Sequence, residues 1–393
     1  MAQTLRRLGA QGGPHMLSRP GLLFAALGAA AIFLPFLTLA ANRIVAGQGV
    51  PIWSLAQAAP GLVALVLGLA LGVISRPALR LLGAALGLAG LLWLLVQGSN
   101  ALLSDAGEFA RVSPAAGFWC LLVVLSLLMA DALGALSPGP WARAALLALT
   151  VGLVALLLRS GALSDLSIMQ EYASRKSGFQ TAALRHLGLA FGSLAAAALI
   201  GLPLGIACHS SARLREATLP VLSFLQTIPS LAMFGIMIPI LGWIATAVPG
   251  AKAIGIAGIG FAPAFFALVL YSLLPVVANL LAGLQSTPPE AREAARGMGM
   301  TGFQRLIKVE FPLGLPVILA GLRIVLVQNI GLAVIAGLIG GGGFGTFVFQ
   351  GLNQTATDLI LLGTLPTVAL ALISAITMDI LVELATPTAE RTR

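Results

Sequence analysis

Residues 288–312, PPEAREAARGMGMTGFQRLIKVEFP, form the one long polar interruption in the C-terminal half of a very apolar chain. Thr287 and Glu290 before and inside it have the spacing of a capping box, and Pro288 suits the first helical position. The backbone donors at the start of a helix would then be satisfied. A short helix is therefore predicted to begin here.

Gly297 and Gly299 are expected to end this helix, because glycine readily adopts the left-handed conformation that closes helices. Thr301 and Gln304 repeat the capping-box spacing, and Pro312 leads into the next apolar span. The pattern predicts a compact helix-turn-helix at a membrane surface. An ordinary amphipathic loop between two membrane helices is the alternative.

The composition places the chain in a membrane. Hydrophobic residues make up 59% of it, charged residues only 9%, and the mean hydropathy is +1.01. A soluble domain has about a quarter of its residues charged. The sequence therefore predicts an all-α polytopic membrane protein, and the net charge of +9 is attributed to basic loops rather than to nucleic-acid binding.

About ten transmembrane helices are predicted, because each crossing needs about 20 apolar residues. The segment at 218–247 contains Pro229 and Pro239 and is expected to be broken or partly re-entrant. The predicted spans are 21–41, 57–75, 79–98, 116–136, 142–160, 182–207, 218–247, 254–283, 313–340 and 357–384.

The positive charges predict the orientation. With both termini in the cytoplasm, inner loops collect 14 of the 22 Lys and Arg residues and outer loops collect 6. This bias agrees with the positive-inside rule and places 287–312 in the cytoplasm. Arg6, Arg7 and Arg19 precede an apolar run too long for a typical signal peptide, so a retained first span is expected.

A polar segment at 161–180 divides the chain and is expected to contain a short interfacial helix. The predicted division is an N-terminal membrane extension of about five helices at 1–178 and a five-helix core at 179–393. The extension is expected to brace the core rather than to have an activity of its own.

The polar stretch resembles the EAA loop of ABC importer permeases, in which EAA is followed by spaced Gly and Pro positions. The matching residues are Glu293, Ala294, Ala295, Gly299 and Pro312. Val309 and Phe311 depart from the family pattern only by apolar replacement. The resemblance implies that residues 179–393 form a type I permease core and that 287–312 couples it to an ATPase.

The most informative membrane stretch is FLQTIPSLA at 224–232. Pro229 lacks an amide donor, and polar side chains at membrane depth need protein or a water-filled cavity around them. The candidate pathway residues are Gln226, Thr227, Pro229 and Ser230. The alternative is a helix kink satisfied by neighbouring helices. Together with His186–Leu187 and GLPLGI at 201–206, this stretch resembles permeases of osmoprotectant importers.

Arg323 and Asp379 are candidate buried charges, because ionisable groups inside a membrane are expensive and usually paired. Snorkelling to the surface is the alternative. The chain contains no GxxxxGK[ST], HExxH or GxSxG motif, so no catalytic, metal or cofactor-binding residues are predicted.

The resemblance implies a bacterial inner-membrane permease for a compatible solute such as glycine betaine, choline or carnitine. The implied partners are ABC ATPase subunits holding ATP and magnesium, a second identical or paralogous permease, an extracytoplasmic solute-binding protein and membrane lipids. Two alternatives stay open: an ABC permease for another small solute, such as an amino acid, and a secondary transporter, which would show paired broken helices in both halves.

Overall fold

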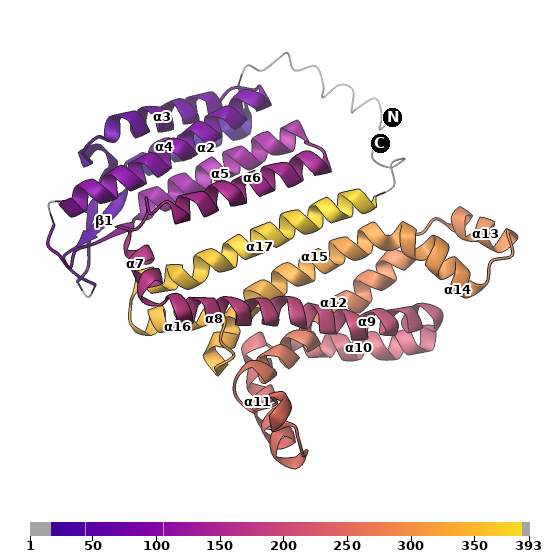
Figure 1. The fold of residues 1–393 in the computed structure, drawn as a ribbon. Coiled ribbons are helices and arrows are strands. Elements are labelled where there is room, and N and C mark those ends of the chain that lie inside the picture. The colour runs from indigo at the N-terminus through magenta and orange to yellow at the C-terminus, as the bar shows by residue number, and fades with distance from the viewer. Residues whose placement is uncertain (1–16, 44, 105, 387–393) are drawn as a thin grey trace. The chain divides into compact units, whose positions relative to one another are not determined.

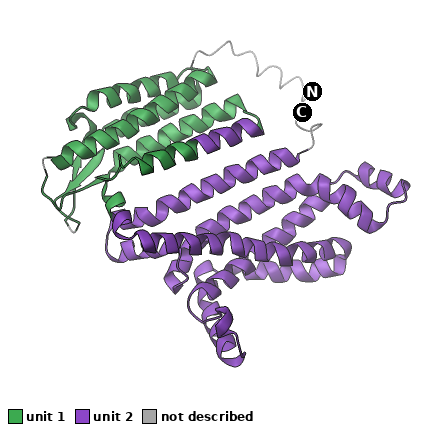
Figure 2. Ribbon diagram, in the orientation of Figure 1, with its two compact units in different colours: residues 1–139, 150–170 green, residues 140–149, 171–393 purple. Residues whose placement is uncertain are grey.

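The computed structural model describes residues 17–43, 45–104 and 106–386. The chain divides into two compact units, residues 1–139 with 150–170 and residues 140–149 with 171–393 (Figure 2). We refer to them as unit 1 and unit 2. Four charges used to predict the orientation lie outside the described residues: Arg6, Arg7, Arg391 and Arg393.

Within the described ranges, eight helices are long and apolar enough to cross a membrane. Two shorter apolar helices, α2 (Arg19–Ile32) and α3 (Ala58–Gly72), lie where the first two spans were predicted. Together they agree with the predicted number of about ten. The eight are Pro77–Ser104, Ala116–Leu136, Pro140–Arg159, Lys176–Ser210, Ser230–Ala247, Phe261–Gln285, Gly302–Ile339 and Thr357–Ala385.

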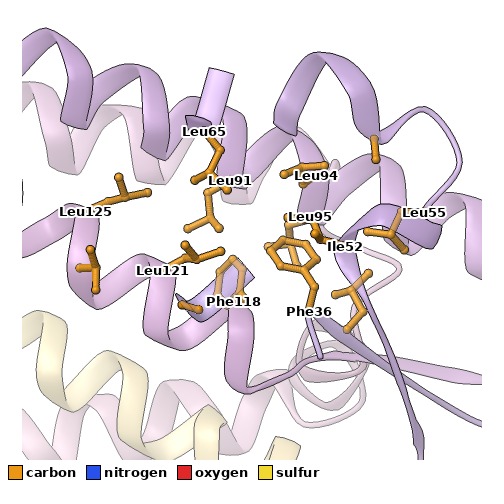
Figure 3. Packing of buried hydrophobic residues seen from close by; sticks show 14 of the residues in the cluster. Phe36, Ile52, Leu55, Leu65, Leu91, Leu94, Leu95, Phe118, Leu121 and Leu125 are labelled. Carbon is orange, nitrogen blue, oxygen red and sulfur yellow. The ribbon is translucent and has the colours of Figure 1, made fainter. Parts of the chain in front are cut away.

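Unit 1 is built from α2, α3, α4 (Pro77–Ser104) and α5 (Ala116–Leu136) around one apolar core (Figure 3). Helices α3 and α4 pack with their backbones close together, because glycines line the contact. A Cβ on Gly68 would lie 2.6 Å from the carbonyl oxygen of Gly83. Small residues of this kind let membrane helices approach closely.

A small antiparallel sheet completes unit 1. Strand β1 (Leu37–Ala40) lies between β2 (Gln48–Val50) and β3 (Arg111–Pro114), with Leu37 opposite both Val50 and Pro114. The predicted first span of 21–41 is therefore wrong beyond Ile32. Helix α2 ends at Ile32, shortly before Pro35, which lacks an amide donor, and Phe36 next to it is fully buried in the core.

Unit 2 is centred on α12 (Phe261–Gln285), which packs against α9 (Ser193–Ser210) and α15 (Phe311–Ile335). Helix α17 (Thr357–Ala385) packs on α15. A buried polar contact joins α9, α12 and α15, since Nδ2 of Asn329 donates to Ser193 Oγ at 3.0 Å and to Ser272 Oγ at 2.8 Å. Such side-chain hydrogen bonds stabilise helix pairs at membrane depth.

The remaining helices of the chain complete the order in Figure 1. They are α6 (Pro140–Arg159), α7 (Ser167–Ser174), α8 (Lys176–Leu187), α10 (Ala212–Thr227), α11 (Ser230–Ala247), α13 (Pro289–Gly297), α14 (Gly302–Arg305) and α16 (Gly345–Asn353). Helix α7 confirms the short helix predicted within 161–180. The predicted span 254–283 is wrong at its start, because Gly255 and Gly260 have positive φ and α12 begins only at Phe261.

Candidate functional site

The polar loop begins with α13, whose first helical residue is Pro289 rather than Pro288. Pro288 is the N-cap, and no side chain caps this helix. Thr287 is buried and donates from Oγ1 to the backbone carbonyl of Glu310 at 3.4 Å. The predicted capping box of Thr287 and Glu290 is therefore wrong, because the Thr287 hydroxyl is already used in a contact with another helix.

The loop reverses at Gly299, which has a φ of +74°. Its amide donates to Arg296 O at 2.9 Å, and the amide of Met300 donates to Ala295 O at 3.1 Å, so the last carbonyls of α13 are satisfied. A Cβ at position 299 would have no heavy atom within 4 Å. The prediction that Gly299 adopts the left-handed conformation is confirmed, and the need for glycine comes from the backbone rather than from crowding.

The second helix of the loop starts with the predicted capping box. Thr301 N donates to Gln304 Oε1 at 2.9 Å, and Gln304 N donates to Thr301 Oγ1 at 3.3 Å. Helix α14 continues through a π-helical turn at Leu306–Glu310 into α15. Pro312 follows this turn as the second residue of α15, and because it lacks an amide hydrogen it cannot donate to the turn before it.

The outer surface of the loop carries apolar side chains without partners. Met298 is 69% exposed and Phe303 is 72% exposed. Glu293 and Ala294 are exposed beside them, whereas Ala295 is buried. The exposure of Phe303 could not be predicted from the sequence, because periodicity alone does not say which face of a helix is covered.

The membrane helix at 218–247 is broken, as predicted. Helix α10 ends at Thr227 and α11 begins at Ser230, with Pro229 in an extended conformation (φ −54°, ψ 139°). Gln226 Nε2 donates to the carbonyl of Tyr271 on α12 at 2.8 Å. Thr227 Oγ1 donates to the carbonyl of Phe224 at 2.7 Å, within its own helix.

Tyr271 is the residue that sequence reasoning missed at the break. Its hydroxyl donates to the backbone carbonyl of Ile228, one of the two residues between α10 and α11. A buried carbonyl at a helix end needs such a partner. The only available signal was that Tyr271 is the sole tyrosine within the predicted spans, and one residue in isolation does not identify its partner.

The two candidate buried charges lie together in unit 2. Arg323 on α15 donates to Oδ1 of Asp379 on α17. Oδ2 of the same carboxylate accepts from Arg143 at 2.8 Å, and Arg143 also contacts Glu383 at 3.1 Å. The cluster therefore balances two positive charges with two negative ones.

Two family comparisons account for most of the chain. Residues 18–169 match the N-terminal domain of the ABC transporter permease YehY. Residues 188–391 match the binding-protein-dependent transport system inner membrane component. The chain belongs to this family of ABC importer permeases. It is thus a multi-pass inner-membrane transport subunit, and the interpretation as a secondary transporter is wrong.

Curated relatives match about half of the permease. It is 41% identical over 189 residues to the osmoprotectant import permease protein OsmW of Salmonella typhimurium, covering 48% of this chain and 83% of that one. It is 36% identical over 189 residues to the carnitine transport permease protein OpuCB of Listeria monocytogenes, covering 48% and 79%. A chain of the MetNI methionine ABC transporter is 22% identical with a TM-score of 0.49, covering 55% and 99%.

Proposed function

We propose that this permease forms the translocation pathway for a compatible solute such as glycine betaine, choline or carnitine. The observation that carries the proposal is the match to osmoprotectant and carnitine permeases over most of those relatives' length. The QTIPSLA stretch at the helix break agrees with it. Both termini are proposed to lie in the cytoplasm.

The polar loop is the proposed contact for separate ATPase subunits, which hold ATP and magnesium. Figure 1 draws α13 and α14 at one end of unit 2 and α16 at the other. Met298 and Phe303 offer exposed apolar area there, and Glu293 offers a carboxylate for a basic group of the partner. The proposed coupling residues are Glu293, Ala294, Ala295, Gly299 and Pro312.

The break between α10 and α11 is the proposed pathway element. Hydrogen bonds from Gln226 and Tyr271 tie the end of α10 and the linking residue Ile228 to α12. Thr227 and Pro229 are exposed at the break. Non-helical backbone at membrane depth is tolerated only against protein or a water-filled cavity. A second copy of this chain or a paralogue would complete the cavity.

Tight capture of the solute is assigned to an extracytoplasmic binding protein. A quaternary ammonium is held best by an aromatic cage. This chain has only 2 Tyr and 5 Trp residues, and Tyr271 already donates its hydroxyl to the helix break. The permease therefore needs only to pass the cation on.

The test is uptake by cells with and without the gene at high osmolarity. Deletion should lower the uptake of at least one of labelled glycine betaine, choline and carnitine, and the intact gene should restore it. A matched culture at low osmolarity controls for growth. If uptake of all three is unchanged and uptake of an amino acid falls, the alternative solute class replaces the proposal.

A further inference from the structure

A buried carboxylate joins the polar loop to the neighbouring helices of unit 2. Glu310, the last residue of the π-helical turn, is 2% exposed. Its Oε1 accepts a hydrogen bond from Arg305 Nε at 2.8 Å and lies 3.7 Å from Arg292 Nε. Its Oε2 lies 2.9 Å from Nε2 of His209. Each oxygen is therefore held by a basic side chain.

The basic side chains come from three separate helices. Arg292 lies on α13, Arg305 ends α14, and His209 lies in the last turn of α9. Arg292 also donates to the carbonyl of Leu284, in the last turn of α12, at 2.6 Å. Glu310 itself leads directly into α15. Glu310 and its basic partners thus connect both helices of the polar loop to the ends of α9, α12 and α15.

A carboxylate removed from water is stable only while its partners stay in place. If α13 or α14 moved while His209 on α9 stayed in place, part of the Glu310 charge would be left unpaired. Because an unpaired Glu310 carboxylate would cost free energy, Glu310 and its basic partners are expected to move together. The end of α9 is therefore expected to follow the loop.

Helices α9 and α12 are packed on each other, and Tyr271 of α12 is hydrogen-bonded to Gln226 at the end of α10 and to Ile228 in the helix break. We propose that Glu310 is a positioning residue that passes movement of the polar loop to α9 and α12. The inference rests on the proposed function, in which α13 and α14 receive the ATPase. The connection from the polar loop to α9 and α12 then runs through the side chain of Glu310.

A purely structural ion cluster would have a different signature. Its loss would lower the amount of folded complex, and ATP hydrolysis and uptake would fall in proportion. Loss of a transmitting contact lowers the number of solute molecules imported per ATP. That ratio is independent of how much complex survives.

The experiment uses the full complex of permease, ATPase and binding protein in liposomes. ATP hydrolysis and glycine betaine uptake are measured on the same sample. Glu310→Gln should lower uptake per ATP by about tenfold or more, since it removes the charge and keeps the shape. Glu310→Asp, which keeps the carboxylate, should recover part of the ratio. Glu216→Gln, an exposed site on α10 near the end of α9, should leave it unchanged.

His209→Leu provides a second, independent variant, because leucine cannot donate to Glu310 and Glu310 stays paired with Arg305. It should also lower uptake per ATP, even if Glu310→Gln does not assemble. A native ratio in His209→Leu, or in an assembled Glu310→Gln complex, would overturn the proposal. If the wild-type complex imports none of the three compatible solutes, the proposed function fails instead, and the solute that it does import serves for the same ratio.

Discussion

The hydroxyl of Tyr271 on α12 donates to the carbonyl of Ile228, which together with Pro229 separates α10 from α11. The break in the membrane helix is therefore held by a side chain from a different helix. Gln226 donates back to the carbonyl of Tyr271 at 2.8 Å, so the two segments exchange hydrogen bonds. The break in unit 2 is therefore stabilised by hydrogen bonds to α12 and is not an unsatisfied kink.

Tyr271→Phe should destabilise the permease by about 1 kcal/mol, because the partly buried carbonyl of Ile228 loses its donor. Uptake should fall further than this loss of stability explains if the break lines the pathway. Tyr172→Phe is the matched control, since Tyr172 is the only other tyrosine and contacts Phe179 through its ring. Thermal unfolding in detergent and uptake in cells provide the measurements. Equal effects of the two substitutions would contradict the assignment.

Asp379→Asn should lower stability, because Arg323 loses its carboxylate and Arg143 keeps only Glu383. We expect a loss of about 2 kcal/mol, less than for a fully buried pair because the side chains are partly exposed. The double variant Asp379→Asn with Arg323→Gln should recover part of it. Thermal unfolding of both, with Glu216→Gln as the control, measures the difference. No recovery in the double variant would show that the two charges are not coupled.

The proposed orientation predicts that position 300 faces the cytoplasm. A Met300→Cys variant, in a background with Cys120→Ala, should not react with a membrane-impermeant maleimide in intact cells. Cys208 can stay, since it is fully buried. Ala253→Cys, in the segment between α11 and α12, should react as the external control. Labelling at position 300 without cell lysis would reverse the orientation.

Glu293→Ala should weaken uptake without abolishing it. Glu293 is exposed, and exposed ion pairs usually contribute about 1 kcal/mol or less. The ATPase should still co-purify with the variant, because Met298 and Phe303 remain. Uptake in cells and the yield of co-purified ATPase are the readouts. Complete loss of ATPase binding would show that one carboxylate dominates the contact.

Local rules predicted the parts of the site that depend on neighbouring residues. The capping box at Thr301, the left-handed Gly299 and the break at Pro229 all follow from backbone chemistry within a few residues. Apolar length likewise located the long helices. Residues close in sequence determine these features, so the sequence alone predicts them.

The features that the sequence did not predict depend on contacts between residues far apart in the chain. Thr287 satisfies the local spacing of a cap, yet its hydroxyl is taken by the carbonyl of Glu310. Glu310 occupies a position that the family pattern leaves open, and only the fold brings His209 to it. Leu37 is apolar enough for a span, but the pairing with Val50 and Pro114 in the sheet places it in a strand.

Gly299→Asp tests whether residues 287–312 couple an ATPase to transport. A side chain at 299 costs roughly 1 kcal/mol or more in the left-handed backbone and changes the shape of the turn. Gly302→Asp is the matched control, because Gly302 is equally uncrowded but lacks a positive φ, and an acidic residue suits the start of α14. Uptake of the identified solute is measured alongside co-purification of the ATPase, at equal levels of inserted permease. We expect Gly299→Asp to abolish uptake and Gly302→Asp to retain most of it. Normal uptake by Gly299→Asp with the ATPase attached would show that residues 287–312 do not couple the ATPase to transport.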